Sequence, residues 1–202
     1  MAGQAIHIRS RSVYTSKPMN ASEMIGLIET ACAGAVVAKQ ADGLHPWVSV
    51  KPERWREVAT FVRDDARLKL DMLRSITGLD YPDKKQLAAA YDLISFDHRH
   101  ELCIKVFVDR PALPARPVIA SVAEVWRAAD WHERETYDLL GIAFEGHPDS
   151  VTDQDGTHPR RILLPDDWTG HPLRKDYVFP REYGGIPGSV EIDWAQKPDY
   201  PK

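Results

Sequence analysis

The stretch AAAYDLISFDHRHELCIKVFV, residues 88–108, decides the fold of this chain. In its second half the apolar residues Leu102, Ile104 and Val106 occupy every other position. A two-residue period is typical of a β-strand with one buried face. The polar connection 97–100 separates this segment from the apolar run 88–96. The pattern therefore predicts an antiparallel hairpin.

Before this hairpin the sequence predicts helices and further short strands. Asn20 and Glu23 form the pattern of a capping box, and an apolar stripe follows at helical spacing. The stripe consists of Ile25, Ile28 and Cys32. Residues 36–37 and 44–50 predict two short strands around the turn signal Asp42-Gly43. Pro52 suits the first turn of a second helix, and residues 70–79 resemble a strand.

After the hairpin, Pro111, Pro114 and Pro117 exclude regular structure. Two further capping boxes are then expected. Ser121 with Glu124 would open a helix whose inward residues are Val122, Val125, Trp126 and Ala129. Asp130 with Glu133 would start a helix that ends at a Gly141 cap, with an Arg134–Asp138 ion pair on its surface.

The helices come before and after the strands instead of alternating with them. This order indicates the α+β class, with a small mixed or antiparallel sheet and packed helices. The division we expect is a mobile, basic N-terminal arm (1–19), an α+β domain (20–177) and an extended Pro/Gly-rich C-terminal tail (178–202). The tail keeps many apolar residues, so it should lie either on another protein or on this chain's own core.

Composition excludes several classes of protein. The net charge of −4 and the pI near 6.1 argue against a nucleic-acid partner. Cys32 and Cys103 are the only cysteines, too few for an iron–sulfur cluster or a cysteine-based zinc site. The longest apolar run, residues 31–38, is far shorter than the ~20 residues that cross a bilayer.

Residues 130–177 hold the chemically unusual part of the chain. This acidic block contains four of the eight histidines, namely His132, His147, His158 and His171. Their spacings lack the short repeat typical of catalytic zinc ligands. A stand-alone metal-dependent hydrolase that uses these histidines and nearby aspartates is nevertheless one hypothesis.

The same block carries two long motifs. The first comprises Glu133, Arg134, Glu135, Tyr137, Asp138, Gly141, Gly146, His147 and Pro148. The second comprises Arg161, Gly170, His171, Pro172, Leu173, Arg174, Lys175, Asp176 and Tyr177. Both motifs, in this order, resemble the C subunit, or thirty-kilodalton subunit, of proton-pumping NADH:quinone oxidoreductase, respiratory complex I. The resemblance covers about residues 22–180.

The resemblance implies a subunit without a catalytic site, cofactor or metal of its own. FMN and iron–sulfur clusters would lie on partner subunits, and the chain would pack on the D (forty-nine-kilodalton) subunit that helps to form the quinone pocket. It would reach a membrane only through partners, and the weak N-terminal targeting signal favours the cytoplasmic face of a bacterial inner membrane over the mitochondrial matrix side. The same subunit in a related hydrogenase- or ferredoxin-linked complex is an alternative.

The resemblance also assigns roles to particular residues. Arg134, Arg161, Arg174 and Lys175 would be interface or intrasubunit ion-pair groups. Gly141, Gly146 and Gly170 would set backbone turns. Residues 150–159 look like an insertion relative to the family pattern.

Overall fold

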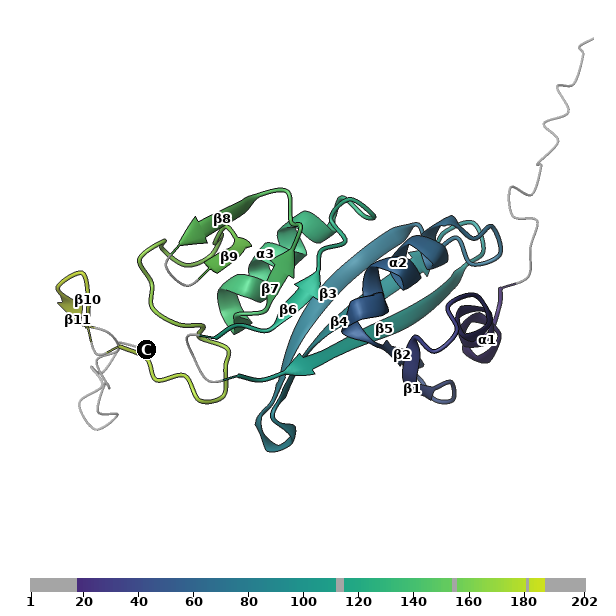
Figure 1. The fold of residues 1–202 in the computed structure, drawn as a ribbon, viewed down its shortest axis with the longest axis horizontal. Coiled ribbons are helices and arrows are strands. Elements are labelled where there is room, and N and C mark those ends of the chain that lie inside the picture. Colours follow the sequence, from purple (N-terminus) through teal and green to yellow (C-terminus); the bar gives the residue numbers. More distant parts are fainter. Residues whose placement is uncertain (1–17, 112–114, 154–155, 181, 188–202) are drawn as a thin grey trace, which may run out of the picture.

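The computed structural model describes residues 18–111, 115–153, 156–180 and 182–187. Its centre is a five-stranded mixed sheet in the order β1-β2-β5-β4-β3 (Figure 1). The strands are β1 (Val36–Gln40), β2 (Trp47–Val50), β3 (Met72–Tyr81), β4 (Gln86–Ser95) and β5 (His100–Asp109). Only the β2–β5 ladder is parallel among the four ladders of this sheet. The structure confirms the α+β class and the central β4–β5 hairpin.

One face of the sheet forms the core. Val48, Ile104, Tyr91 and Ile76 stand side by side across four strands and are all buried. Helix α2 (Trp55–Asp64) packs on this face, with the Trp55 ring centroid 4.3 Å from that of Tyr91. Removing these apolar side chains from water is the main stabilising contribution to the fold.

The predicted N-terminal elements are confirmed. Helix α1 (Ala21–Ala31) begins at the Asn20 capping box, in which Glu23 N donates to Asn20 Oδ1 at 2.9 Å. The Asp42-Gly43 turn lies between β1 and β2, and Gly43 has a φ of +108°. Pro52 begins a short 3₁₀ turn, η1 (Pro52–Arg54), that leads directly into α2.

A smaller unit follows the sheet in sequence and packs beside β3. It consists of two parallel strands, β6 (Val118–Ala120) and β7 (Ala143–Glu145), helix α3 (Ala129–Leu140) and the hairpin of β8 (Ser150–Asp153) and β9 (Gly156–Pro159). Gly78 allows the close approach of α3 to β3, because a Cβ at this position would overlap Leu140 Cδ1. Strands β8 and β9 lie within residues 150–159, the segment expected to be an insertion.

The predicted helix over residues 121–129 is wrong. Residues 121–128 form turns and irregular backbone, and α3 begins only at Ala129. Ser121 does not pair with Glu124, because its hydroxyl donates to the buried Glu133 carboxylate at 2.6 Å. Glu124 instead forms an ion pair with Arg56 of α2. Ser121 and Glu124 therefore each bind a residue distant in sequence and do not form the predicted capping box.

The second predicted capping box is also wrong. The N-cap residue of α3 is Ala128, whose side chain makes no capping hydrogen bond. The C-terminal cap is as predicted: Gly141 adopts a φ of +75° and its N–H donates to Tyr137 O at 2.7 Å.

The described ends of the chain lie far apart. Helix α1 is at one end of the long axis, and the small hairpin of β10 (Glu182–Tyr183) and β11 (Ile186–Pro187) is at the other (Figure 1). A second 3₁₀ turn, η2 (Pro82–Lys84), forms the tip of the β3–β4 hairpin. Most of the expected N-terminal arm and most of the expected C-terminal tail lie outside the described residues. No described helix is both long enough and apolar enough to span a membrane.

Candidate functional site

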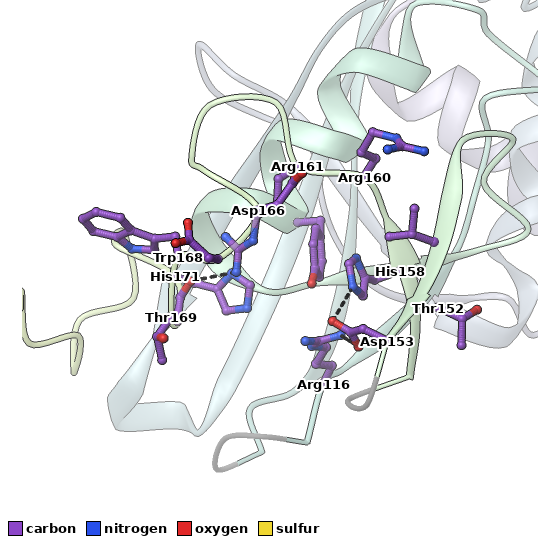
Figure 2. Close-up of a pocket in the computed structure, with 14 residues that line it drawn as sticks. Arg116, Thr152, Asp153, His158, Arg160, Arg161, Asp166, Trp168, Thr169 and His171 are labelled. Atoms are coloured by element: carbon purple, nitrogen blue, oxygen red, sulfur yellow. Dashed lines mark hydrogen bonds and ion pairs between the residues drawn. The ribbon is translucent and has the colours of Figure 1, made fainter. Parts of the chain in front are cut away.

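The two sequence motifs meet around a cavity of about 540 Å³ beside the end of α3. Figure 2 shows the β8–β9 hairpin on one side and the segment 166–171 on the other. The lining residues include Arg116, Tyr137, Asp153, His158, Arg160, Arg161, Asp166, Trp168, Thr169 and His171.

Asp138 holds the second motif to the first. Its side chain is fully buried, and Oδ1 accepts from Arg161 Nη1 at 2.7 Å. Oδ2 accepts the backbone N–H groups of Ile162, Leu163 and Leu164 at 3.1, 2.7 and 2.9 Å. Burial would raise the pKa of Asp138, but these four donors outweigh it and hold the pKa below its ordinary value. The predicted Arg134–Asp138 pair is therefore wrong.

Arg134 turns instead toward the start of the second motif. Its Nε donates to Arg160 O at 3.0 Å, and Nη1 lies 3.5 Å from Asp149 Oδ2. Arg161, besides its ion pair, donates to Gly170 O at 3.2 Å. Both arginines thus make intrasubunit contacts, one of the two roles expected for them.

His171 closes the buried end of the cavity. Its Nδ1 lies 2.9 Å from Asp138 O and, because a carbonyl oxygen only accepts, Nδ1 carries the proton. Burial lowers the pKa of His171 to about 4, so the ring is neutral at pH 7. The ring lies directly beside Gly141, where a side chain would overlap it.

The β8–β9 hairpin packs against the ring of Tyr137. The His158 ring stacks on it with centroids 4.4 Å apart and an interplanar angle of 15°. His158 Nε2 lies 3.0 Å from Asp153 Oδ2, and Arg116 Nη1 lies 3.7 Å from Asp153 Oδ1. Burial raises the pKa of Tyr137 to about 12, so its phenol stays protonated. The hairpin is therefore a packed wall of the cavity.

A second network fixes the end of the second motif to the sheet. Arg110 Nε donates to Asp80 Oδ1 at 2.6 Å, and Arg110 Nη2 donates to Asp176 Oδ1 at 2.7 Å. The N–H of Lys175 donates to Asp80 Oδ2 at 2.8 Å. Asp80 and Arg110 belong to neither motif. They lie just beyond the ends of the predicted strands 70–79 and 102–108. From the sequence, only this position could have indicated that the two side chains come close together.

A buried carboxylate lies at the other end of α3. Glu133 accepts from Ser121 Oγ at 2.6 Å and from Val122 N at 2.7 Å. His147 Nε2 lies 4.0 Å from Glu133 Oε2 and 3.1 Å from Asp130 O. Burial raises the pKa of Glu133 to about 7. Glu133 thus ties the turns at 121–122 to the helix.

We expect Glu133→Gln to change the pH dependence of stability. The unfolded carboxyl titrates near 4.5 and the folded one near 7, so the folded chain holds a proton that the unfolded chain releases. The protonated Glu133 carboxyl therefore stabilises the fold fully below pH 4.5. This contribution to the free energy of unfolding, about 3 kcal/mol, is lost as the pH rises to about 7. In unfolding curves between pH 4.5 and 8 the stability of the wild type should therefore fall by this amount relative to that of the variant, because the rise with pH that the buried His171 contributes is the same in both proteins.

Glu135→Gln is the matched control, because Glu135 lies on the same helix and is exposed. It makes the same change of charge and should leave the pH dependence as in the wild type. Equal pH profiles for the wild type and Glu133→Gln would contradict the assignment.

The other motif residues have mainly structural positions. Gly141, Gly146 and Gly170 have φ values of +75°, +77° and +83°, a left-handed conformation that glycine adopts readily. Tyr177 OH donates to Thr169 O at 3.2 Å. Leu173 and Lys175 are exposed, whereas Arg174 is 4% exposed.

The histidines of the block do not gather. His132 faces Glu135, His147 contacts Asp130, and His158 and His171 pack against Tyr137. Within the described residues, no three His, Cys, Asp or Glu side chains are placed to hold a metal ion.

Comparison with known proteins identifies the family. Residues 48–183 match the family model described as "Respiratory-chain NADH dehydrogenase, 30 Kd subunit". The C subunit of NADH-quinone oxidoreductase from Chloroherpeton thalassium is 45% identical over 71% of this chain. The alignment covers 55% of that relative, so this chain spans little more than half its length. The corresponding C subunit from Roseiflexus castenholzii is 40% identical over 75% of this chain and 80% of its own.

A solved structure shares the fold. A chain of the membrane-bound sulfane sulfur reductase, an archaeal respiratory membrane complex, has a TM-score of 0.60 and 20% identity over 78% of this chain and 85% of its own. At this identity the likeness concerns the fold alone. The sequence matches show more: the chain belongs to the family of 30 kDa subunits of the respiratory-chain NADH dehydrogenase.

Proposed function

We propose that this chain is a cofactor-free, non-catalytic subunit of a membrane-bound NADH:quinone oxidoreductase. The complex would pass electrons from NADH through FMN and iron–sulfur clusters on other subunits to quinone, and would couple this transfer to proton translocation. The chain would pack on the quinone-pocket D subunit. It would lie at the cytoplasmic face of a bacterial inner membrane and reach that membrane only through its partners.

One observation carries this proposal: the motif carboxylates Glu133 and Asp138 are used inside the chain, while apolar residues that follow the second motif are exposed. Asp138 binds Arg161 and three backbone N–H groups, and Glu133 binds two donors. On the following segment Val178 is 84% exposed, Phe179 66% and Ile186 71%. Apolar groups gathered on one exposed segment are typical of a protein–protein contact surface.

The arrangement supports assembly better than a stand-alone hydrolase. The histidines that a metal site would need are engaged separately along the block. Whether the complex takes electrons from NADH or, as in a related hydrogenase- or ferredoxin-linked complex, from another donor depends on the neighbouring subunits.

Affinity purification from gently solubilised native membranes tests the proposal. Mass spectrometry should identify subunits that carry the quinone pocket, the clusters and the flavin beside this chain. Recovery of this chain alone, from the soluble fraction, would contradict the assembly role. The identity of the co-purified electron-input subunits would decide between NADH and the alternative donors.

A further inference from the structure

A second cavity, of about 490 Å³, lies beside the first and shares the wall formed by residues 167–170. Its other lining residues are Arg174, Asp176, Tyr177, Val178, Pro180, Glu182 and Tyr183. The cavity therefore adjoins the exposed apolar segment on which the proposed function rests.

Two side chains that line this cavity, the buried Arg174 and the half-buried Trp168, have buried N–H groups without an acceptor. Arg174 is 4% exposed and Nη2 donates to Pro111 O at 3.2 Å. Its Nε and Nη1 have no hydrogen-bond partner among the described residues, and neither has the indole Nε1 of Trp168. Each unsatisfied buried donor costs about 1–3 kcal/mol, and more when it is charged. Three such donors at one cavity are thus a substantial cost.

Three of the nearby carboxylates are already bound elsewhere, and Glu182, which also lines the cavity, is exposed and forms no ion pair with Arg174. Asp80 and Asp176 both accept from Arg110, and Asp80 also accepts the N–H of Lys175. Asp167 accepts from Tyr183 OH at 2.6 Å. The Arg174 charge therefore lacks a direct carboxylate partner within the described part of the chain.

We propose that this cavity binds the carboxylate of an Asp or Glu side chain on a partner subunit, which pairs with Arg174 and accepts from the Trp168 indole. The inference rests on the assembly role proposed above. A carboxylate matches the guanidinium in charge and in the geometry of its two donors. The exposed Val178 and Phe179 at the rim fit a polypeptide rather than a free anion. Lining side chains such as Tyr183 shift when the carboxylate enters, because the donors are covered in the free chain.

Arg174→Met separates docking from a structural role. Because replacing an uncompensated buried charge with an apolar side chain is neutral or stabilising, the isolated full-length variant should unfold at the wild-type temperature or above. Its recovery in the membrane complex should fall by about tenfold to a hundredfold, as expected when a charged hydrogen bond is lost. A parallel loss of stability and recovery, or unchanged recovery, would overturn the proposal.

Trp168→Phe provides a second variant that keeps the ring and removes only the N–H donor. It should also lower recovery in the complex without lowering the unfolding temperature. Wild-type recovery of this variant would exclude the indole from the proposed carboxylate site.

Arg174→Lys identifies the partner group. Carbodiimide joins an amine to a carboxylate in contact with it, so treatment of the intact variant complex should link the new amine to an Asp or Glu of a neighbouring subunit. The wild-type complex is the control, because it offers only the Lys175 amine in this segment. Links only to Asp80 or Asp176, or none, would overturn the proposal. If the wild-type chain enters no complex, the proposed function itself is wrong.

Discussion

Asp138→Ala is expected to lower the free energy of unfolding by about 3–5 kcal/mol, the cost of breaking a buried ion pair by removing one partner. The substitution leaves Arg161 buried without its carboxylate, and it removes the acceptor of three backbone N–H groups. Chemical denaturation of the purified chain measures the loss. Hydrogen exchange at residues 162–164 should accelerate by at least about a hundredfold.

Glu135→Ala, on the exposed side of the same helix, is the control and should cost less than about 0.5 kcal/mol. Asp138→Asn keeps one carbonyl acceptor, so its cost should fall between those of the two alanine variants. A loss for Asp138→Ala no larger than that for Glu135→Ala would show that the carboxylate does not hold the second motif in place.

Gly141→Ala is expected to cost about 2–5 kcal/mol for two separate reasons. The φ of +75° is a left-handed conformation that costs a non-glycine residue about 1–2 kcal/mol. The added Cβ would also lie 2.6 Å from His171 Nε2, so the ring must move, at about 1–3 kcal/mol. Moving the ring would disturb its hydrogen bond to Asp138 O. Thermal and chemical unfolding measure the combined loss.

Gly34→Ala isolates the first reason. Gly34 has nearly the same φ, +76°, and no atom lies within 4 Å of the position that an alanine Cβ would occupy there. This control should lose only the cost of the left-handed backbone, about 1–2 kcal/mol. Equal losses for both glycine variants would mean that His171 does not pack against Gly141 in solution.

The described residues from 18 to 109 followed their local sequence signals closely. The Asn20 capping box, the Asp42-Gly43 turn and the alternation over residues 102–108 each specify a backbone conformation through neighbours within a few positions. The β2–β5 pairing joins residues 47–50 to 103–106, and no local pattern indicates it. The sequence therefore predicted these elements better than their order in the sheet.

The pairings predicted between sequence neighbours were wrong where a buried charged side chain binds a residue distant in sequence. Ser121 and Glu133 read as parts of two separate capping boxes, yet they bind each other. Asp138 is four residues from Arg134, but in the fold it pairs with Arg161. An exposed helical pair is worth only about 0.2–0.5 kcal/mol, whereas a buried carboxylate needs several donors. The motif resemblance located these residues, but only the fold shows which pairs they form.

The parallel β2–β5 ladder also sets an order of events during protein synthesis. Strands β1 and β2 leave the ribosome first, but the edge of β2 is completed only when β5 follows. At 5–20 residues per second, the stretch from residue 50 to residue 103 takes roughly 3–10 s to make. During that time the β2 edge and the apolar Val48 and Val50 side chains lack their sheet partner. The nascent chain should therefore bind a ribosome-associated chaperone most strongly before β5 emerges.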